Sequence, residues 1–161
     1  MRLPANDRRV LEELTGERLR VIYAATGSGS KAVILPKHFA VLEKGAWQVI
    51  AWSEIQTGAW DANAKILSWQ LISGANGHVQ LDNPRELPLV FAERVRAAIV
   101  TEREILVSEV GIVRIAGRRA PGSVDPLSWS VAADSGVDIT DNRVTAAALE
   151  EAEKINNELN Y

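Results

Sequence analysis

The stretch Thr26–Lys31, with the sequence Thr-Gly-Ser-Gly-Ser-Lys, contains the residue types of a phosphate-binding loop. Such a loop uses glycines to bring backbone amides close to a phosphate and a lysine to neutralise its charge. Here Ser30 stands where a glycine must precede the lysine, and the stretch leads into a predicted strand instead of a helix N-terminus. We therefore interpret Thr26–Lys31 as a hairpin turn.

His38 and His78 are the two histidines of the chain. A catalytic histidine needs a nucleophile and an orienting carboxylate beside it. In a strand, His78 and Asp82 would lie about 13 Å apart, and His38 follows Pro36 in a predicted loop. Two distant histidines in a chain without cysteine also make a poor structural zinc site. We interpret both as surface or turn residues and predict no catalytic residue, no metal site and no cofactor.

Four carboxylates fall at the ends of predicted strands: Glu54, Asp61, Asp82 and Asp134. A pair of such groups could act as the acid and base of a glycosidase, but nothing in the pattern selects two of them. Side chains at these positions usually cap turns, and we assign them that role.

Four of the five tryptophans lie between Ala46 and Ile72, at positions 47, 52, 60 and 69. Exposed rings could stack on bases or sugars. Trp69 alternates with polar neighbours along a predicted strand, so we expect it to face the core. Trp47 and Trp52 have opposite parity on one predicted strand, which leaves one of the two rings open to a ligand or partner.

The adjacent pair Arg118-Arg119 precedes a loop rich in proline and glycine. It could bind a phosphate or an acidic partner, and the alternative is a solvated strand end. The candidate ligand-binding or partner-binding residues are therefore Trp47, Trp52, Arg118 and Arg119.

The composition indicates one domain, or one domain with an appendage, within 161 residues. The chain lacks cysteine, its start has no signal-peptide pattern, and no segment reaches the roughly 20 apolar residues of a membrane span. We expect a soluble cytoplasmic protein without stable membrane insertion. The net charge of −3 is concentrated in residues 102–161, which carry −5. A body without a basic stripe argues against binding to nucleic acid.

The hydrophobic pattern predicts a short helix, seven strands, a helix, three strands and a final helix. Hairpin connections favour antiparallel sheets, with Gly74–Gly77 closing one hairpin. Asn6 or Asp7 should cap the first helix, and Thr140 or Asp141 the last. The predicted ranges are helices at 3–14, 89–100 and 141–159, and strands at 19–26, 31–35, 39–42, 46–52, 55–60, 66–72, 78–81, 104–110, 113–119 and 128–133.

Residues 14–100 resemble a pleckstrin-homology-like (PH-like) barrel of the GRAM or bacterial PH type. Gly16-Glu17-Arg18-Leu19 is similar to the entry of its first strand, and Ala51-Trp52-Ser53-Glu54-Ile55 to the step before its fifth strand. The helix from Pro88 takes the place of the helix that closes such a barrel. Phosphoinositide-binding PH domains carry a basic cluster around the first turn, whereas here Lys31 is the single basic residue beside it.

The whole chain also resembles a family of uncharacterised actinobacterial proteins of similar length, to which no activity is attached. The shared features are Trp52–Ile55, Ala59-Trp60-Asp61, Glu93-Arg94-Val95, Arg118-Arg119, Trp129 and an Asp-rich entry to the last helix.

We therefore predict an α+β protein, mainly antiparallel β. A PH-like seven-stranded barrel capped by a helix, with a short N-terminal helix, occupies residues 1–101. A β-β-β-α extension at residues 102–161 packs on it or on another copy of the chain.

The predicted function is a non-enzymatic PH-like module that binds an unknown protein partner through a sheet edge, a loop rim or the last helix. A barrel can also hold a small apolar ligand or lipid inside or at its rim, which remains an alternative. An enzyme whose site is invisible in the sequence is a second alternative, and homo-oligomerisation stays open.

Overall fold

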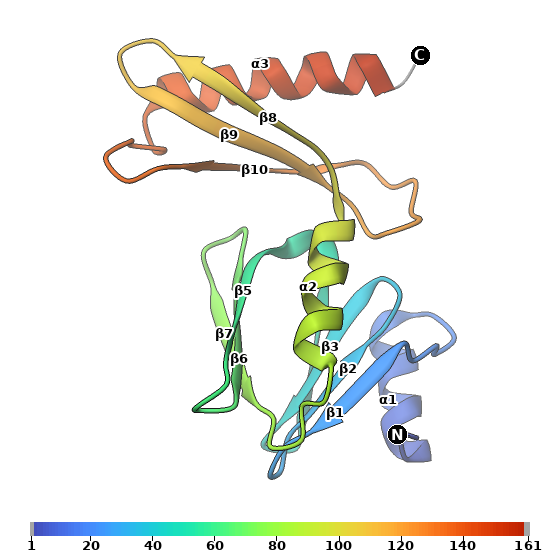
Figure 1. Cartoon of the computed structure of the whole chain (residues 1–161). Helices are drawn as coiled ribbons and strands as arrows, with labels where there is room; N and C mark the ends of the chain where they lie inside the picture. The colour runs from blue at the N-terminus through green and yellow to red at the C-terminus, as the bar shows by residue number, and fades with distance from the viewer. Residues whose placement is uncertain (1, 160–161) are drawn as a thin grey trace. The chain divides into compact units, whose positions relative to one another are not determined.

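The computed structural model describes residues 2–159 and shows an α+β fold built from antiparallel sheets and three α-helices (Figure 1). The order of elements agrees with the order predicted from the hydrophobic pattern. The elements are α1 (Ala5–Thr15), β1 (Tyr23–Thr26), β2 (Lys31–Ile34), β3 (His38–Glu43), β4 (Ala46–Ala51), the 3₁₀ turn η1 (Trp52–Glu54), β5 (Ile55–Asp61), β6 (Ile66–Leu71), β7 (Asn76–Gln80), α2 (Leu87–Ala97), β8 (Ile99–Val107), β9 (Gly111–Arg118), β10 (Ser128–Ala133) and α3 (Asn142–Leu159).

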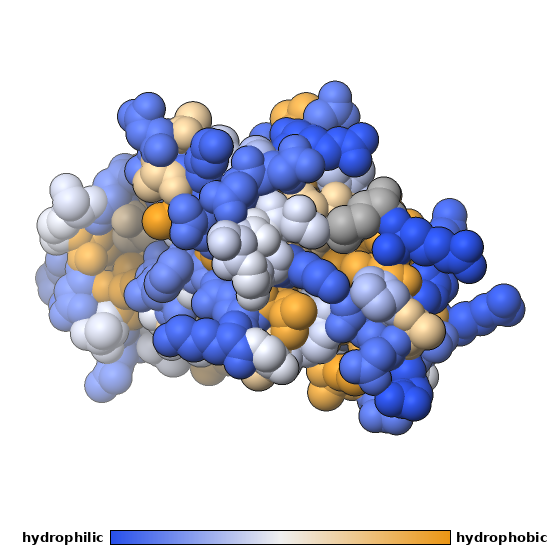
Figure 2. Space-filling model, turned by 90° about the horizontal axis from the view of Figure 1, so that it is seen from below, coloured by the Kyte–Doolittle hydropathy of each residue, from blue (hydrophilic) through white to orange (hydrophobic). Residues whose placement is uncertain are grey.

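The chain forms two compact units. The first contains the residues up to Ala98 together with Ala120–Asp125, and the second contains Ile99–Arg119 and the residues from Pro126 onward. The first unit therefore holds β1 to β7 with α1 and α2, and the second holds β8 to β10 with α3. No helix within residues 2–159 is both long and apolar enough to cross a membrane. On the face shown in Figure 2, hydrophilic residues predominate and hydrophobic residues lie between them.

The seven strands of the first unit form two antiparallel sheets, ordered β1-β2-β3-β4 and β5-β6-β7. The predicted antiparallel hairpins are confirmed, but within residues 2–159 these strands do not close into a single barrel. The β1–β2 turn joins the two sheets at one corner, where the Asn83 amide donates to the Thr26 carbonyl and the Ser30 hydroxyl donates to the Gln80 carbonyl.

Helix α1 covers the outer face of the four-stranded sheet. Its Leu11 is completely buried in a cluster with Val33 and Ala40 of that sheet. Asp7 adds a polar contact, because its carboxylate accepts hydrogen bonds from the Lys31 ammonium at 2.7 Å and from the Trp47 indole at 3.3 Å. The expected cap at Asn6 or Asp7 is wrong, since Pro4 occupies the N-cap position and no side chain caps the helix.

Helix α2 packs against β1, β2, η1 and β5 and closes the core between the two sheets. Phe91 of α2 lies 5.0 Å from the ring centre of Phe39 and 5.5 Å from that of Trp52. Gly58 of β5 makes room for Phe91, because a Cβ atom there would lie 2.3 Å from Cε1 of the ring. Four aromatic rings, those of Phe39, Trp52, Trp69 and Phe91, fill this core and are at most 4% exposed.

The second unit is a three-stranded sheet, ordered β10-β9-β8, with α3 packed on β8 and β9. Val107, Val113 and Val144 form its buried centre. Arg103 joins the sheet to the helix, because its guanidinium forms ion pairs with Glu151 and Glu158 of α3. The β-β-β-α order predicted for this part of the chain is present, with β8 beginning at Ile99, five residues earlier than position 104.

Asp141 caps α3, as predicted. Its carboxylate accepts a hydrogen bond from the backbone amide of Arg143 at 2.9 Å and also contacts the guanidinium of the same residue. These contacts lower the pKa of Asp141 to about 2, mainly through the side-chain hydrogen bond from Arg143. Thr140, the other predicted cap, instead donates to the carboxylate of Asp138.

The predicted turn at Gly74–Gly77 is placed two residues too late. The chain turns at Gly74, whose φ angle is +94° and whose amide donates to the Leu71 carbonyl. Asn76 and Gly77 are already paired with β6. The first strand also starts later than predicted, at Tyr23 instead of position 19, and Trp52 lies in η1 instead of at the end of β4.

Candidate functional site

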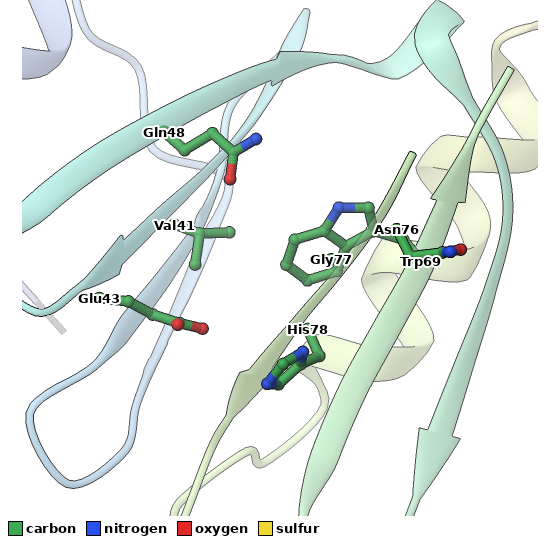
Figure 3. Close-up of a pocket in the computed structure, with 7 residues that line it drawn as sticks. All are labelled: Val41, Glu43, Gln48, Trp69, Asn76, Gly77 and His78. Carbon is green, nitrogen blue, oxygen red and sulfur yellow. The ribbon is translucent and has the colours of Figure 1, made fainter. Parts of the chain in front are cut away.

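A cleft of about 240 Å³ opens between the two sheets of the first unit (Figure 3). We call it the rim cleft. It lies where the end of the β3–β4 hairpin faces the start of β7. Seven residues line it: Val41, Glu43, Gln48, Trp69, Asn76, Gly77 and His78.

Strand register explains why the four-stranded sheet sends polar groups into this cleft. Val41 pairs with Gln48, and Glu43 pairs with Ala46, so all four side chains share the inner face of the sheet. Val41 is 4% exposed and forms the apolar floor. The inner face thus changes from buried to accessible toward the hairpin end, and Glu43 and Gln48 provide a carboxylate and an amide there.

The opposite wall of the cleft is the indole of Trp69. A Cβ atom at Gly77 would lie 2.5 Å from both Nε1 and Cε2 of this ring, so the indole lies directly across the glycine backbone. Phe39 contacts the ring edge-on at 5.2 Å and fixes it from the core side. Among residues 2–159, no hydrogen-bond acceptor is paired with Nε1 of Trp69, although the amide of Gln48 faces this ring in Figure 3.

His78 lines both the rim cleft and a second pocket, which lies on the outer face of the three-stranded sheet. Ser68 is its partner on β6, and Gln70 and Asn76 form the next pair. The second pocket has a volume of about 340 Å³ and is bounded by small and polar side chains, including Thr57, Ala59 and Ser68. Polar groups that can donate and accept hydrogen bonds therefore continue around the exposed edge of β7.

Backbone strain occurs next to the cleft. Lys44 and Gly45 join β3 to β4 with φ angles of +50° and +78°. A two-residue hairpin turn of type I′ has positive φ at both positions, and lysine adopts this conformation at a cost of roughly 1–2 kcal/mol. The strained turn thus follows Glu43 directly in the chain.

The four residues predicted from the sequence do not form one site. Trp47 and Trp52 contribute to different hydrophobic clusters, Trp47 beneath α1 and Trp52 between the two sheets. Trp52 is completely buried, and its indole donates to the Leu35 carbonyl at 2.9 Å. Trp47 is half-buried with its indole bound to Asp7, so neither ring lines the rim cleft.

Arg118 and Arg119 belong to the second unit. Arg118 is 5% exposed and its guanidinium donates to the Ser130 hydroxyl, while its Nε has no partner among the described residues. Burial lowers the pKa of Arg118, and the Glu102 carboxylate opposes this effect. Arg119 is half-exposed at the end of the strand.

The stretch Thr26–Lys31 is a hairpin turn, as predicted. The Gly27 amide donates to the Ser30 carbonyl, and a Cβ atom at Gly27 would lie 2.1 Å from the Gln80 carbonyl oxygen. Lys31 is paired with Asp7. These contacts engage the Gly27 amide and the Lys31 ammonium, two of the donors that a phosphate would need.

The carboxylates at strand ends have turn and surface roles. Asp61 accepts hydrogen bonds from the backbone amides of Asn63 and Ala64, and Asp134 forms an ion pair with Arg114. Within residues 2–159, no group of three or more histidine or carboxylate side chains could hold a metal ion.

His38 is half-buried at the start of β3, and this burial lowers its pKa below the usual value of 6.5. The nearby Glu17 carboxylate opposes the shift, while Lys37 adds to it. The unfolded chain therefore binds this proton at higher pH than the folded chain. It follows that the contribution of His38 to the free energy of unfolding is fully present above pH 6.5 and is lost as the pH falls through the folded-state pKa.

We expect two histidine resonances in an NMR titration, with His38 titrating below pH 6.5. A His78→Gln variant assigns the peaks. A His38→Gln variant should lose part of the decrease in stability between pH 7 and pH 5. Titration of His38 above 6.5 would contradict the burial argument.

Comparisons of the chain with models of protein families, with curated proteins and with solved structures find no match. No family is therefore assigned.

The rim cleft contains residues that sequence reasoning did not select. Glu43 falls between the predicted strands 39–42 and 46–52, His78 is expected to be a surface or turn residue, and Gly77 is expected to lie in a turn. A glycine inside a strand pattern signals a close approach by another group, and Gly77 follows this rule with Trp69. Glu43 and Gln48 carry no comparable signal, because their shared face depends on the register of β3 and β4.

Proposed function

We propose that the first unit is a PH-like binding module whose rim cleft accepts an extended segment of a protein partner. The observation that carries the proposal is the position of the cleft. It lies between two exposed sheet edges and combines an apolar floor with side chains that can pair with a peptide backbone.

The order of elements supports the PH-like part of the proposal. Seven antiparallel strands are followed directly by α2, whose Leu87 and Phe91 are buried in the core between the two sheets. This is the pattern on which the resemblance to PH-like domains rests. The turn after β1, where a basic cluster would hold an inositol phosphate, has its single lysine engaged by Asp7. A protein segment is therefore a better candidate than a phosphoinositide headgroup.

The free edges of the two sheets favour the binding of an extended partner segment. Among the described strands, β4 pairs only with β3, and β7 pairs only with β6. A strand with one unpaired edge offers backbone donors and acceptors to an added strand, and neighbouring pockets then select its side chains. The Gln80 end of β7 is covered by Ser30, so the accessible part of this edge begins at Asn76, beside the cleft.

The size and lining of the cleft favour a peptide over a small apolar ligand. Typical pockets for small molecules measure roughly 300–1,000 Å³ and are mostly apolar. The rim cleft has about 240 Å³ and is lined by Glu43, Gln48, Asn76 and His78. The interior between the sheets is filled by the four aromatic rings of the core. These features supply little apolar surface for a lipid chain.

The test is selection of random peptides on the full chain, followed by titration of the enriched sequences. Binding should shift the emission of Trp69, because this indole forms a wall of the cleft. A Glu43→Gln variant should bind the selected peptides at least about tenfold more weakly, which corresponds to loss of one charge-assisted hydrogen bond.

Glu54→Gln is the matched control, because Glu54 is an exposed carboxylate outside the cleft. It removes the same charge and should leave the affinity unchanged. Failure to enrich any peptide would count against the proposal, as would equal affinities of the two variants. A Trp69 response to lipid vesicles but to no peptide would favour the lipid alternative.

A further inference from the structure

One face of the sheet in the second unit carries exposed hydrophobic residues. Side chains alternate along a strand, and Val107 and Val113 point toward α3, so their neighbours Leu106 and Ile112 point to the opposite face. Leu106 is 79% exposed and Ile112 is 53% exposed. Leu106 and Ile112 are register partners across β8 and β9, so the two side chains lie next to each other and form one apolar pair.

Opposite charges flank the apolar pair on the same face. Glu104 of β8 is the register partner of Arg114 of β9. Arg114 forms an exposed ion pair with Asp134 at 3.3 Å through one nitrogen, and its side chain remains 34% exposed. The carboxylate of Glu104 forms no ion pair with any residue between 2 and 159, and it stays exposed. The open face, defined by Glu104, Leu106, Ile112 and Arg114, therefore has β8 acidic and β9 basic beside an apolar centre.

We propose that a second copy of this chain docks on the open face. Consider a two-fold axis that is parallel to the strands and runs above the open face, between the two copies, over the line that separates β8 from β9. Rotation about it places β8 of one copy over β9 of the other at the same height. Because Leu106 and Ile112 are in register, Leu106 then meets Ile112 of the second copy. Glu104 meets Arg114 of the second copy for the same reason, and each contact occurs twice.

Pairing of two copies through the edge of β8 is disfavoured by charge. Antiparallel pairing of β8 with itself about Arg103 would place Glu102 opposite Glu104 of the second copy, on the same face of the sheet. Pairing about Glu102 or Glu104 would place that carboxylate opposite itself. Like charges directly opposite each other are destabilising, and charged side chains are a common protection of edge strands. Charge repulsion at the β8 edge therefore favours face-to-face docking over pairing through this edge.

The decisive experiment mixes two charge variants of the full chain. Glu104→Arg places two arginines on the open face, and Arg114→Glu places two glutamates there. Each variant alone should lose self-association by at least about tenfold, because each cross-copy contact becomes repulsive. A mixture of the two restores both opposite-charge contacts, so it should form a heterodimer.

Light scattering and sedimentation give the masses, with 17.6 kDa for the monomer. The wild type should show a concentration-dependent dimer in the micromolar to millimolar range of small interfaces. Leu106→Ser should weaken the dimer. Leu149→Ser, at a 67% exposed position on α3, should not.

Three results would overturn the proposal: a monomeric wild type at all concentrations, unchanged dimerisation of the charge variants, or a mixture that stays monomeric while the wild type dimerises. Circular dichroism of each variant confirms that the chain is folded. Because the assay reads association of the chain with itself, it is independent of peptide binding at the rim cleft.

Discussion

Replacement of Trp52 by alanine is expected to lower the free energy of unfolding by about 3–5 kcal/mol, in the range observed when a large buried aromatic side chain is removed. Trp52 is completely buried, and its ring lies 5.6 Å from Phe39 and 5.5 Å from Phe91. The variant would leave a cavity where η1, β3 and α2 meet. It would also remove the hydrogen bond from the indole to the Leu35 carbonyl.

Chemical denaturation of the full chain, followed by tryptophan fluorescence, measures this loss. Trp52→Phe should retain most of the packing but leave the Leu35 carbonyl without its donor, at a cost of about 1–3 kcal/mol. Trp47→Ala is the comparison from the other face of the sheet. Trp47 is half-buried, so Trp47→Ala should lower the free energy of unfolding by roughly half as much as Trp52→Ala. Equal losses for Trp47→Ala and Trp52→Ala would contradict the assignment of Trp52 to the core.

Replacement of Gly77 by alanine is expected to destabilise the first unit by about 1–3 kcal/mol and to distort the rim cleft. The new Cβ atom would lie 2.5 Å from Nε1 and 2.6 Å from Cζ2 of Trp69. The indole cannot move toward the core, because Phe39 packs against it. It must therefore shift along β7 or toward the cleft, and either movement changes the wall that a peptide would contact.

The emission spectrum of Trp69 and the affinity for selected peptides report this change together. Gln80→Ala is the matched control, because Gln80 is an exposed residue of β7 with its side chain on the outer face, and it does not line the cleft. It should leave stability and emission nearly unchanged. A Gly77→Ala variant with normal stability and normal emission would show that the glycine is not required by the ring.

The rim cleft illustrates which parts of a site a sequence can indicate. The alternation around Trp69 correctly predicts that its ring faces the core, because the period of two along a strand is a local property. The parity argument for Trp47 and Trp52 assumed one continuous strand, whereas the chain leaves β4 at Ala51 and enters η1. A single 3₁₀ turn was enough to change the direction of Trp52 and place it in the core.

The exposure of individual side chains, by contrast, depends on contacts between segments that are distant in the sequence. Arg118 was expected at a solvated strand end or on an anion, and the structure buries it beside Ser130. The sequence predicts the turn two residues too late, near Gly77 instead of at Gly74, because Asn-Gly is a strong local turn signal. The ring of Trp69, eight positions earlier in the chain, requires that glycine for a steric reason.

The order of helices and strands, the antiparallel hairpins and the cap of α3 at Asp141 were determined by the sequence itself, because hydrophobic periodicity and capping act over a few residues. Only the tertiary structure decided that the seven strands divide into two sheets, and that Glu43, Gln48, Trp69 and His78 meet at their open corner. The physical reason is that a cleft is formed by register and by the packing of Trp69 on Gly77. These are contacts between strands that no local pattern encodes.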